Sequence, residues 1–243
     1  DLIRGIPQMV GLRTQFVHLY VKDNTEESGG KFEDYGIYTQ VEQLNKTALK
    51  SHGLDSNGQL YKINSFEFYR YEDIIKKEDD AGYDKTAFEK MLEIKGDSDH
   101  TKLIDMLTDL NDYSIGIEDV LKEHFDEENI VYWMAFQILM GNVDTQNRNV
   151  YLYSPLNSDI WYFIAWDNDG CLMRSEYELK NFSDQGSWEK GISNYWGNVL
   201  FQRCLKSRSF REKLNDAILE LREYLNKDML ISKIESYKNV LKP

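Results

Sequence analysis

The sequence lacks the signatures of several common protein classes. Its two cysteines, Cys171 and Cys204, form no C-x-x-C pair, and although they could bridge, they say little about the redox compartment. Its four histidines show no metal-ligand spacing. No apolar run approaches the ~20 residues that a membrane-spanning helix needs, and no stretch has the pattern of a signal peptide. These absences exclude a membrane helix within this sequence.

Common hydrolase and nucleotide-binding motifs are also missing. The sequence has no G-x-S-x-G of a serine hydrolase and no G-x4-G-K-[ST] of a P-loop protein. It also has no G-x-G-x-x-G loop. If this chain binds a nucleotide, it does so without the glycine-rich loop of ordinary protein kinases.

Basic residues are scarce relative to acidic ones. The chain has 29 Lys and Arg against 42 Asp and Glu, for a formal net charge of -13. Such a surface repels phosphate backbones, so we expect no nucleic-acid partner and favour basic partners. The 243 residues are 41% hydrophobic and 29% charged, the balance of a globular protein with a real core.

The first third of the chain predicts β structure. In "QFVHLYVKD", Phe16 and His18 fall on one face with Val17 on the other, which predicts a strand. After the turn-rich "NTEESGGKFED", "YGIYTQVEQL" predicts a second strand, so residues 15–44 should form a hairpin with a long connection. "LDSNGQLYKI" predicts a turn and a third short strand that ends near Lys62.

Residues 84–142 predict helices. "YDKTAFEKMLEIKG" predicts a helix that ends at Gly96, and "SDHTKLIDMLTDLNDY" predicts one that starts from a Ser/Asp cap. Asp126 should cap "EENIVYWMAFQILMGN", whose apolar C-terminal half predicts burial. Two short strands follow, "NVYLYS" and "IWYFIAW", joined by the turn "PLNSD". The stretch after Gly170 is irregular to about Ser187, and two amphipathic helices should end the chain.

These elements predict an α+β fold in a single domain over residues 1–243. Residues 1–80 should form a small β-rich lobe, and residues 81–243 a mostly helical lobe with an embedded β-hairpin. The opening "DLIRGIPQMVGL" resembles the inside of a domain, so we expect the domain to begin upstream of Asp1.

Polar residues flank the embedded hairpin and predict a metal site. Asn149 stands at the start of its first strand, in "GNVDTQNRNVYLY", and Asp167 just past the end of its second, in "IAWDNDGCLM". Because antiparallel neighbours lie roughly 5 Å apart, both side chains should reach one ion. Asp144 should face the same place, and Asp169 is a second ligand or a nearby acid. Magnesium prefers such hard oxygen ligands together with water and substrate phosphate.

The order of these residues matches the template for phosphoryl transfer by protein kinases. In that template a loop Asp acts as base, an Asn five residues later binds metal, and an Asp after two short strands binds metal. Asp144, Asn149 and Asp167 occupy those places in order. The set therefore predicts a base and two metal ligands.

The surroundings of Asp144 depart from those of ordinary kinases. Asn142 and Val143 replace the usual His-Arg, and no D-F-G is present. Gln146 stands where many kinases have a loop Lys, and Arg148 is the nearest cation that could meet a phosphate. The nucleotide contacts therefore have to differ from the common pattern.

Other interpretations of "IAWDNDGCLM" stay open. The stretch is similar to the D-x-D-G-T-L motif of haloacid-dehalogenase phosphatases, which would make Asp167 the nucleophile and Asp169 the general acid. Against this, Cys171 replaces the Thr, and the 73 residues after Gly170 predict helices rather than strands. An EF-hand calcium loop would use Asp167, Asp169 and Glu178 as ligands. However, Gly170 stands at position 4 of such a loop, whereas an EF-hand has its glycine at position 6. A glycosidase carboxylate pair or a purely structural turn also fits the spacing.

Together the motifs resemble the CotH kinase family, named for spore coat protein H. "GNVDTQNRNVYLY" followed by "WYFIAWDND" is similar to the family pattern G-N-x-D-x-x-x-x-N-x-Y-L-Y, an aromatic strand and W-D-x-D. Upstream, "GLRTQFVHLYVKD" and "YGIYTQVEQL" resemble the family's hairpin, which ends in Y-G-x-Y-x-x-x-E. The likeness covers most of residues 10–170. The family's domain normally begins further upstream, with a segment rich in Arg, Gly and Lys that this sequence does not contain.

The resemblance implies an atypical protein-kinase-like fold. It also implies transfer of phosphate from ATP to Ser or Thr of secreted, cell-surface or spore-coat proteins, and therefore an extracellular place of action. By this likeness Asp144 is catalytic, and Asn149 and Asp167 bind Mg²⁺ or Mn²⁺, with Asp169 as a further candidate ligand.

The sequence does not single out one lysine as the contact for the nucleotide phosphates. Lys62 ends a strand, where a phosphate-binding Lys could stand, although a solvated Lys fits equally well. Glu42 could orient that Lys or contact the nucleotide, Arg148 could meet a phosphate, and Arg13 is a weaker candidate. The main alternative to a kinase is a catalytically inactive relative that keeps the fold as a surface or spore-coat binding module.

Overall fold

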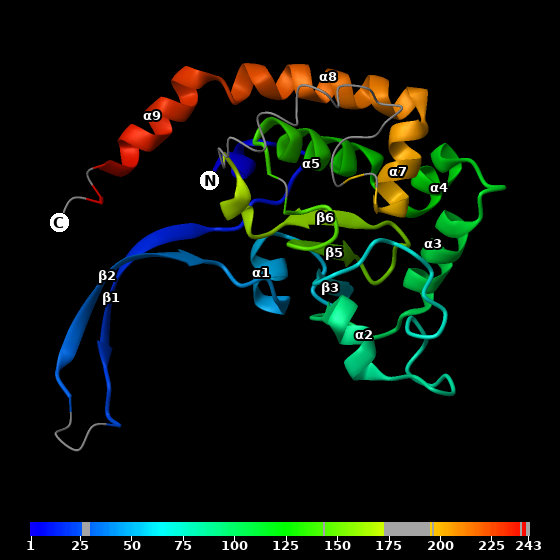
Figure 1. The fold of residues 1–243 in the computed structure, drawn as a ribbon, viewed down its shortest axis with the longest axis horizontal. Helices are drawn as coiled ribbons and strands as arrows, with labels where there is room; N and C mark the ends of the chain where they lie inside the picture. Colours follow the sequence, from blue (N-terminus) through cyan, green and yellow to red (C-terminus); the bar gives the residue numbers. More distant parts are fainter. Residues whose placement is uncertain (26–29, 143, 173–194, 196, 239, 242–243) are drawn as a thin grey trace.

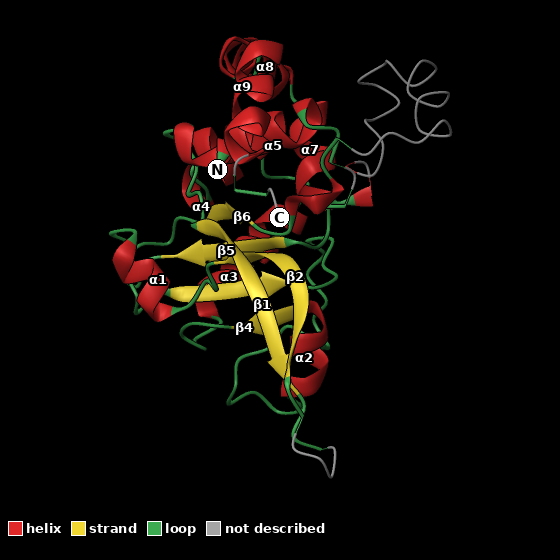
Figure 2. Ribbon diagram, turned by 90° about the vertical axis from the view of Figure 1, so that its left-hand side faces the viewer, coloured by secondary structure: helices red, strands yellow, loops and turns green. Residues whose placement is uncertain are grey.

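A four-stranded antiparallel sheet with strand order β4–β3–β5–β6 lies at the centre of the fold (Figure 2). The computed structural model describes residues 1–25, 30–142, 144–172, 195, 197–238 and 240–241. The strands are β3 (Gln59–Ile63), β4 (Leu92–Ile94), β5 (Val150–Ser154) and β6 (Tyr162–Ala165). Val150 of β5 pairs with Ala165 of β6, so the start of β5 lies beside the end of β6. The embedded hairpin predicted from the sequence is confirmed.

Side chains alternate across this sheet, so each face has its own core. On one face Leu152 and Phe163 join the larger core, which contains the buried helix α5 (Glu127–Leu139). On the other face Tyr151 belongs to a smaller core that includes side chains of α1 (Lys46–Ser51). Because both faces are covered, β5 is buried along its whole length.

Helices cover the larger core. Asp126 caps α5 by accepting a hydrogen bond from the Asn129 N–H, as predicted, and α8 lies along the outer side of α5 (Figure 1). The two predicted C-terminal helices are confirmed as α8 and α9, and α9 has no buried residue. Besides α1 and α5, the described residues form the helices α2 (Lys85–Met91), α3 (Thr101–Asn111), α4 (Ile117–His124), α7 (Val199–Lys206), α8 (Arg208–Tyr224) and α9 (Lys227–Lys238), with the short 3-10 turn η1 (Leu2–Gly5) at the start.

The predicted N-terminal hairpin is confirmed, but it stands apart from the central sheet. β1 (Thr14–Lys22) pairs with β2 (Phe32–Val41) in an antiparallel ribbon that projects from the body (Figure 1). Large apolar side chains are exposed along it, Tyr20, Phe32 and Tyr38 among them. A two-stranded ribbon is only marginally stable by itself, so this one depends on contacts at its base.

One predicted helix is shorter than expected. The helix predicted to end at Gly96 is α2 (Lys85–Met91), because the next three residues pair with β3 as β4. Gly96 does not cap a helix: a Cβ on it would lie 2.5 Å from the Gly58 carbonyl oxygen, so it allows a close approach to the sheet. Pairing with an existing strand outweighed the local helical pattern.

Two further details differ from the sequence-based expectation. α3 has His100 at its N-cap position, and Asp99 of the predicted Ser/Asp cap, one residue earlier, accepts a hydrogen bond from the Thr101 N–H. α7 is a helix that no sequence pattern predicted. Most of the stretch predicted to be irregular up to Ser187 lies outside the described residues.

The observed fold is α+β, with β structure toward the N-terminus and helices toward the C-terminus, as predicted. The central sheet takes β3 from residues 1–80 and its other strands from residues 81–243, so both parts share one sheet. Within the described residues, no helix combines the length and hydrophobicity that crossing a bilayer requires. Cys171 and Cys204 are free thiols.

Candidate functional site

Asp144 lies in the loop between α5 and β5, where hydrogen bonds orient it. Its Oδ2 accepts a 2.9 Å hydrogen bond from Asn149 Nδ2, and its Oδ1 lies 3.0 Å from Arg148 Nε. Its backbone N–H donates to Asn142 Oδ1 over 3.2 Å. The Asp144 side chain is still 44% exposed, so it is held in place yet accessible to a substrate.

Asn149 has a backbone conformation and an amide orientation that suit a metal ligand. Its φ of 56° is in the left-handed region, which Asn adopts more readily than most residues. Its Nδ2 donates to both the carbonyl oxygen and Oδ2 of Asp144, at 3.1 and 2.9 Å. Because both partners are acceptors, the amide nitrogen has to face Asp144 and Oδ1 has to face away. One amide can therefore bind the base through nitrogen and a metal through oxygen.

Asp167 and Asp169 form a pair of acids just past β6. Asp167 is also left-handed, with φ of 53°, and it precedes the short 3-10 turn η2 (Asn168–Gly170). Burial raises the pKa of Asp167, and the charge and hydrogen bond of Asp169 raise it further. The charge of Lys62 opposes this rise, whereas the charge of Asp144 adds to it. Asp169, Lys62 and Asp144 therefore all act on the charge state of Asp167.

The donor set fits a hard divalent cation. The two carboxylates of Asp167 and Asp169 and Oδ1 of Asn149 are oxygen ligands of the kind that Mg²⁺ and Mn²⁺ prefer. A cation between the carboxylates would also offset the repulsion that raises the pKa of Asp167. No three His, Cys, Asp or Glu side chains gather around a common point within the described residues. A metal here would therefore need ligands from water and substrate as well.

Three amides that the sequence did not predict connect the Asp144 loop to the turn after β6. Asn142 donates from Nδ2 to Gln137 Oε1 at 3.0 Å and to Asn168 Oδ1 at 3.4 Å. Gln137 donates to the same Asn168 oxygen at 3.1 Å. Since Asn142 also accepts the Asp144 N–H, it links the base to the turn that carries Asp167. The only sequence signal was its position, two residues before Asp144, where kinases have a histidine.

Gly170 allows these two segments to touch. A Cβ on Gly170 would lie 2.7 Å from Asn142 Oδ1 and 3.5 Å from Asp144 Cβ, and the first distance is too short for any other residue. The next residue, Cys171, hydrogen-bonds with Asn142, but burial dominates and raises the pKa of its thiol to about 11. A thiol with that pKa is a poor nucleophile at neutral pH. Gly170 therefore allows the turn after β6 to pack closely against Asn142 and Asp144. Cys171 packs beside it against the larger core.

Lys62 lies on β3 with its charge close to the acid pair. It is half-buried, and its Nζ is 6.0 Å from the centre of the Trp166 ring, one residue before Asp167. Its charge lowers the pKa of Asp167 against the effect of burial. A cation beside the metal ligands is the arrangement that a phosphate-binding lysine requires.

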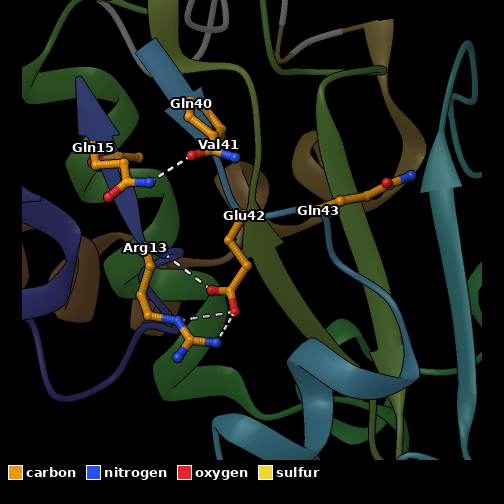
Figure 3. Close-up of a pocket in the computed structure, with 7 residues that line it drawn as sticks. Arg13, Gln15, Gln40, Val41, Glu42 and Gln43 are labelled. Carbon is orange, nitrogen blue, oxygen red and sulfur yellow. Dashed lines mark hydrogen bonds and ion pairs between the residues drawn. The ribbon is translucent and has the colours of Figure 1, made fainter. Parts of the chain in front are cut away.

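Glu42 lies at the base of the ribbon, where it accepts hydrogen bonds from Arg13 (Figure 3) and from His52. The bonds from Arg13 Nε and His52 Nε2 measure 3.0 and 2.7 Å. Chiefly because of Arg13, the pKa of Glu42 falls to about 2. Arg13 and Glu42 line a cavity of about 550 Å³, together with Gln15, Gln40 and Gln43 among others. The described contacts of Glu42 are with Arg13, Ser51 and His52, and none is with Lys62.

The geometry bears on the alternative interpretations. A haloacid-dehalogenase motif follows a strand of an α/β sheet, but β6 is the edge strand of an antiparallel sheet. The EF-hand interpretation needs Glu178, which lies outside the described residues. The arrangement around Asp144 therefore favours phosphoryl transfer with a metal over a phosphatase nucleophile.

Comparison with known protein families identifies the family of this chain. The family model described as CotH kinase protein matches residues 1–243, the whole sequence. No curated protein matches the chain. The matched range includes every candidate residue described above, from Glu42 to Asp169.

Proposed function

The chain belongs to the CotH kinase family, and from that premise we propose that it transfers a phosphoryl group from ATP to a serine or threonine of another protein. Membership of the family implies an atypical kinase that uses ATP and a divalent metal. We further propose that the fold is protein-kinase-like, with the ribbon and β3 on the nucleotide side. The observation that supports this most is the link between Asp144 and Asn149 beside Asp167.

Asp144 is the proposed base. The acceptor hydroxyl would give its proton to this carboxylate while its oxygen bonds to the γ-phosphorus of ATP. The bond from that phosphorus to the bridging oxygen would break, and ADP would leave with the electron pair. Asn149 keeps the carboxylate oriented through its 2.9 Å hydrogen bond. Arg148, whose side chain is 57% exposed, can leave its ion pair with Asp144 and bind a phosphate oxygen of the nucleotide instead.

Asn149, Asp167 and Asp169 are the proposed ligands of Mg²⁺ or Mn²⁺. The metal, when bound, would neutralise charge on the transferred phosphate. The structural support is the donor set itself and the mutual effect of the two carboxylates on the pKa of Asp167. The left-handed φ angles of Asn149 and Asp167 also agree with a functional role, since such conformations gather at functional sites.

Lys62 and Glu42 are the proposed nucleotide contacts. Lys62 can reach phosphate oxygens, because its charge already acts on Asp167. Glu42 lines the cavity at the base of the ribbon and stays ionised there, so a nucleoside would contact it by replacing one of its present donors. Its bonds to Arg13 (Figure 3) and to His52 also fix the cavity wall.

We expect the acceptor to be a secreted, cell-surface or spore-coat protein, as the family resemblance implies. The net charge of -13 favours an acceptor with basic stretches. Incubation with labelled ATP and a panel of such proteins, this chain included, would identify it.

Thermal unfolding with nucleotide is the first test of the proposal. At ATP and Mg²⁺ levels of about 100 times Kd, binding should raise Tm by roughly 5–10 °C. Asp167→Ala should abolish the shift, whereas Asp159→Ala, an exposed acid in the turn between β5 and β6, should keep it. No shift in the unsubstituted protein would contradict nucleotide binding.

Transfer itself separates the kinase from an inactive binding module. Asp144→Ala should keep the nucleotide-induced shift but lower the transfer rate by about 10³-fold, the contribution typical of a general base. The exposed apolar ribbon is the observation that favours a binding module. If the unsubstituted protein and Asp144→Ala bind nucleotide equally and neither transfers phosphate, the binding module is the better description.

A further inference from the structure

A second cavity lies beside Asp144, away from the ribbon. It measures about 350 Å³ and lies where residues 66–71, the loop 144–149 and the start of α7 meet. The lining residues that the structure describes are all polar or glycine, and the chief side chains are those of Glu67, Asp144, Asn147, Arg148 and Asn198. Of these residues, Arg148 has a proposed nucleotide contact and Asp144 the role of base, whereas Glu67, Asn147 and Asn198 have no proposed ligand.

Asp144 belongs to both the cavity and the proposed metal side. It lines the cavity, and it also accepts the hydrogen bond from Asn149. Asn149, Asp167 and Asp169 do not line the cavity. In phosphoryl transfer the base touches the acceptor hydroxyl while the metal holds the phosphate. An acceptor in this cavity would meet Asp144 without displacing the candidate metal ligands.

Glu67 is the fixed acidic wall of the cavity. Its Oε1 accepts a 2.9 Å hydrogen bond from Asn147 Nδ2, and its Oε2 accepts one of 2.8 Å from the Tyr71 hydroxyl. Its backbone oxygen accepts the Val199 N–H at 2.9 Å, which ties it to the first turn of α7. A carboxylate oxygen can accept two hydrogen bonds, so each oxygen has capacity for one more donor. Glu67 is therefore preorganised to accept N–H groups from a ligand.

Asn198 forms the other polar wall and is held just as firmly. Its Nδ2 donates to the Gln146 carbonyl oxygen at 2.8 Å, and its Oδ1 caps α7 by accepting the Phe201 N–H at 3.3 Å. These bonds join α7 to the loop that carries Asp144. The cavity therefore keeps its shape through bonds between all three segments.

We propose that this cavity binds the acceptor as an extended stretch of polypeptide, with a serine or threonine hydroxyl on Asp144 and a backbone N–H on Glu67. The proposal rests on the proposed kinase function, and it assigns the side from which the acceptor approaches. As described above, the hydroxyl proton then passes to Asp144, the phosphoryl group passes to the hydroxyl oxygen, and ADP leaves. Because none of the lining residues that the structure describes is aliphatic or aromatic, a tyrosine ring would find no apolar wall among them.

Steady-state transfer to synthetic peptides tests the assignment. The probes are three otherwise identical peptides with Ser, Thr or Tyr at the centre. Glu67→Gln should raise the KM for the Ser peptide about tenfold and leave the KM for ATP unchanged, because one charged acceptor of a hydrogen bond is lost. The Tyr peptide should have a kcat/KM at least about tenfold lower than the Ser peptide. The matched control is Glu72→Gln, which removes an exposed carboxylate outside the cavity.

Peptide binding without transfer separates this assignment from the kinase proposal. In NMR spectra, the side-chain amide signals of Asn147 and Asn198 should shift when the Ser peptide is added, whereas those of Asn45 should not. If they shift but no phosphate is transferred, the cavity assignment stands and the kinase proposal fails. If transfer occurs without these shifts, or if Glu67→Gln and Glu72→Gln change the peptide KM equally, the assignment is overturned.

Discussion

The two hairpins of this protein lie in opposite environments. β5 and β6 are buried on both faces, whereas β1 and β2 expose tyrosines, a phenylalanine and aliphatic side chains along most of their length. Both pairs are antiparallel and rich in aromatic residues. The buried hairpin carries the candidate catalytic and metal-binding residues at its ends, and the exposed one carries only Glu42 at its base.

This difference shows where rigidity comes from. β5 and β6 pair within a four-stranded sheet, and helices pack on the sheet, so the positions of Asn149 and Asp167 are set by the core. Among the described residues, the ribbon contacts α9 through Phe16 and Tyr237, and at its base Glu42 bonds to Arg13 and His52, so its orientation depends on these few contacts. We therefore expect changes in the first hairpin to act locally and changes in the second to act on the whole fold.

The largest expected effect on stability comes from removing a buried aromatic side chain of the second hairpin. Phe163 is 1% exposed and stacks on Trp133 with ring centres 5.1 Å apart. Phe163→Ala should lower the free energy of unfolding by about 3–5 kcal/mol, through lost burial and the cavity left behind. Tyr38→Ala, on the ribbon and 46% exposed, should change it by no more than about 0.5 kcal/mol. Urea titration of both variants checks this, and equal losses would contradict the contrast.

The amide network beside the buried hairpin should matter next. Asn142→Ala leaves polar groups of Gln137 and Asn168 without this partner and removes the acceptor of the Asp144 N–H. We expect transfer to fall about 10²-fold, because a small displacement of the base costs that much. The nucleotide-induced rise in Tm should remain. Asn57→Ala, at an exposed turn, is the control, and a loss of nucleotide binding with Asn142→Ala would assign Asn142 a different role.

The base of the ribbon should show a smaller and local effect. Glu42→Gln weakens the bonds to Arg13 and His52, so amide hydrogens of the ribbon should exchange roughly tenfold faster while those of β5 and β6 keep their rates. Glu33→Gln, an exposed carboxylate on β2, is the control. Since the pKa of Glu42 is lowered to about 2, its contribution is complete above its ordinary pKa and is lost as the pH falls through about 2. Uniform acceleration of exchange in both hairpins would contradict a local role.

The sequence predicted both hairpins, because alternation and turn residues are local signals. It did not predict that one would be covered on both faces, since burial depends on helices far away in the chain. Asp144, Asn149 and Asp167 were recognisable because the kinase template fixes their order and spacing. Glu67 was not, because it comes from a segment nearly 80 residues away from Asn147 and meets it only in the folded chain.

Local helix propensity also gave a wrong prediction at the end of α2, where the chain pairs with a neighbouring strand instead. The pattern of "EKMLEIKG" favoured continuing the helix to Gly96, but β3 was available to pair with β4. Asn142 and Asn168 were missed for a similar reason: an amide is a common turn residue, and only its partners reveal a network. The residues that carry charge were easier to predict than the neutral ones that hold them.

The smallest expected effect comes from a histidine behind the buried sheet. His100 is fully buried, accepts or donates to the Tyr61 and Tyr83 hydroxyls, and stacks on Phe88 with ring centres 4.2 Å apart. Burial lowers its pKa, although the charges of nearby carboxylates oppose this. The unfolded chain therefore binds a proton more readily than the folded chain, so folding stability should fall as the pH drops below about 6.5, by at most about 1 kcal/mol down to about pH 5.5. His100→Gln should flatten this slope, whereas His18→Gln on the exposed ribbon should leave it unchanged. Urea titrations at both pH values measure the slopes, and a wild-type slope in His100→Gln would show that other groups cause the loss.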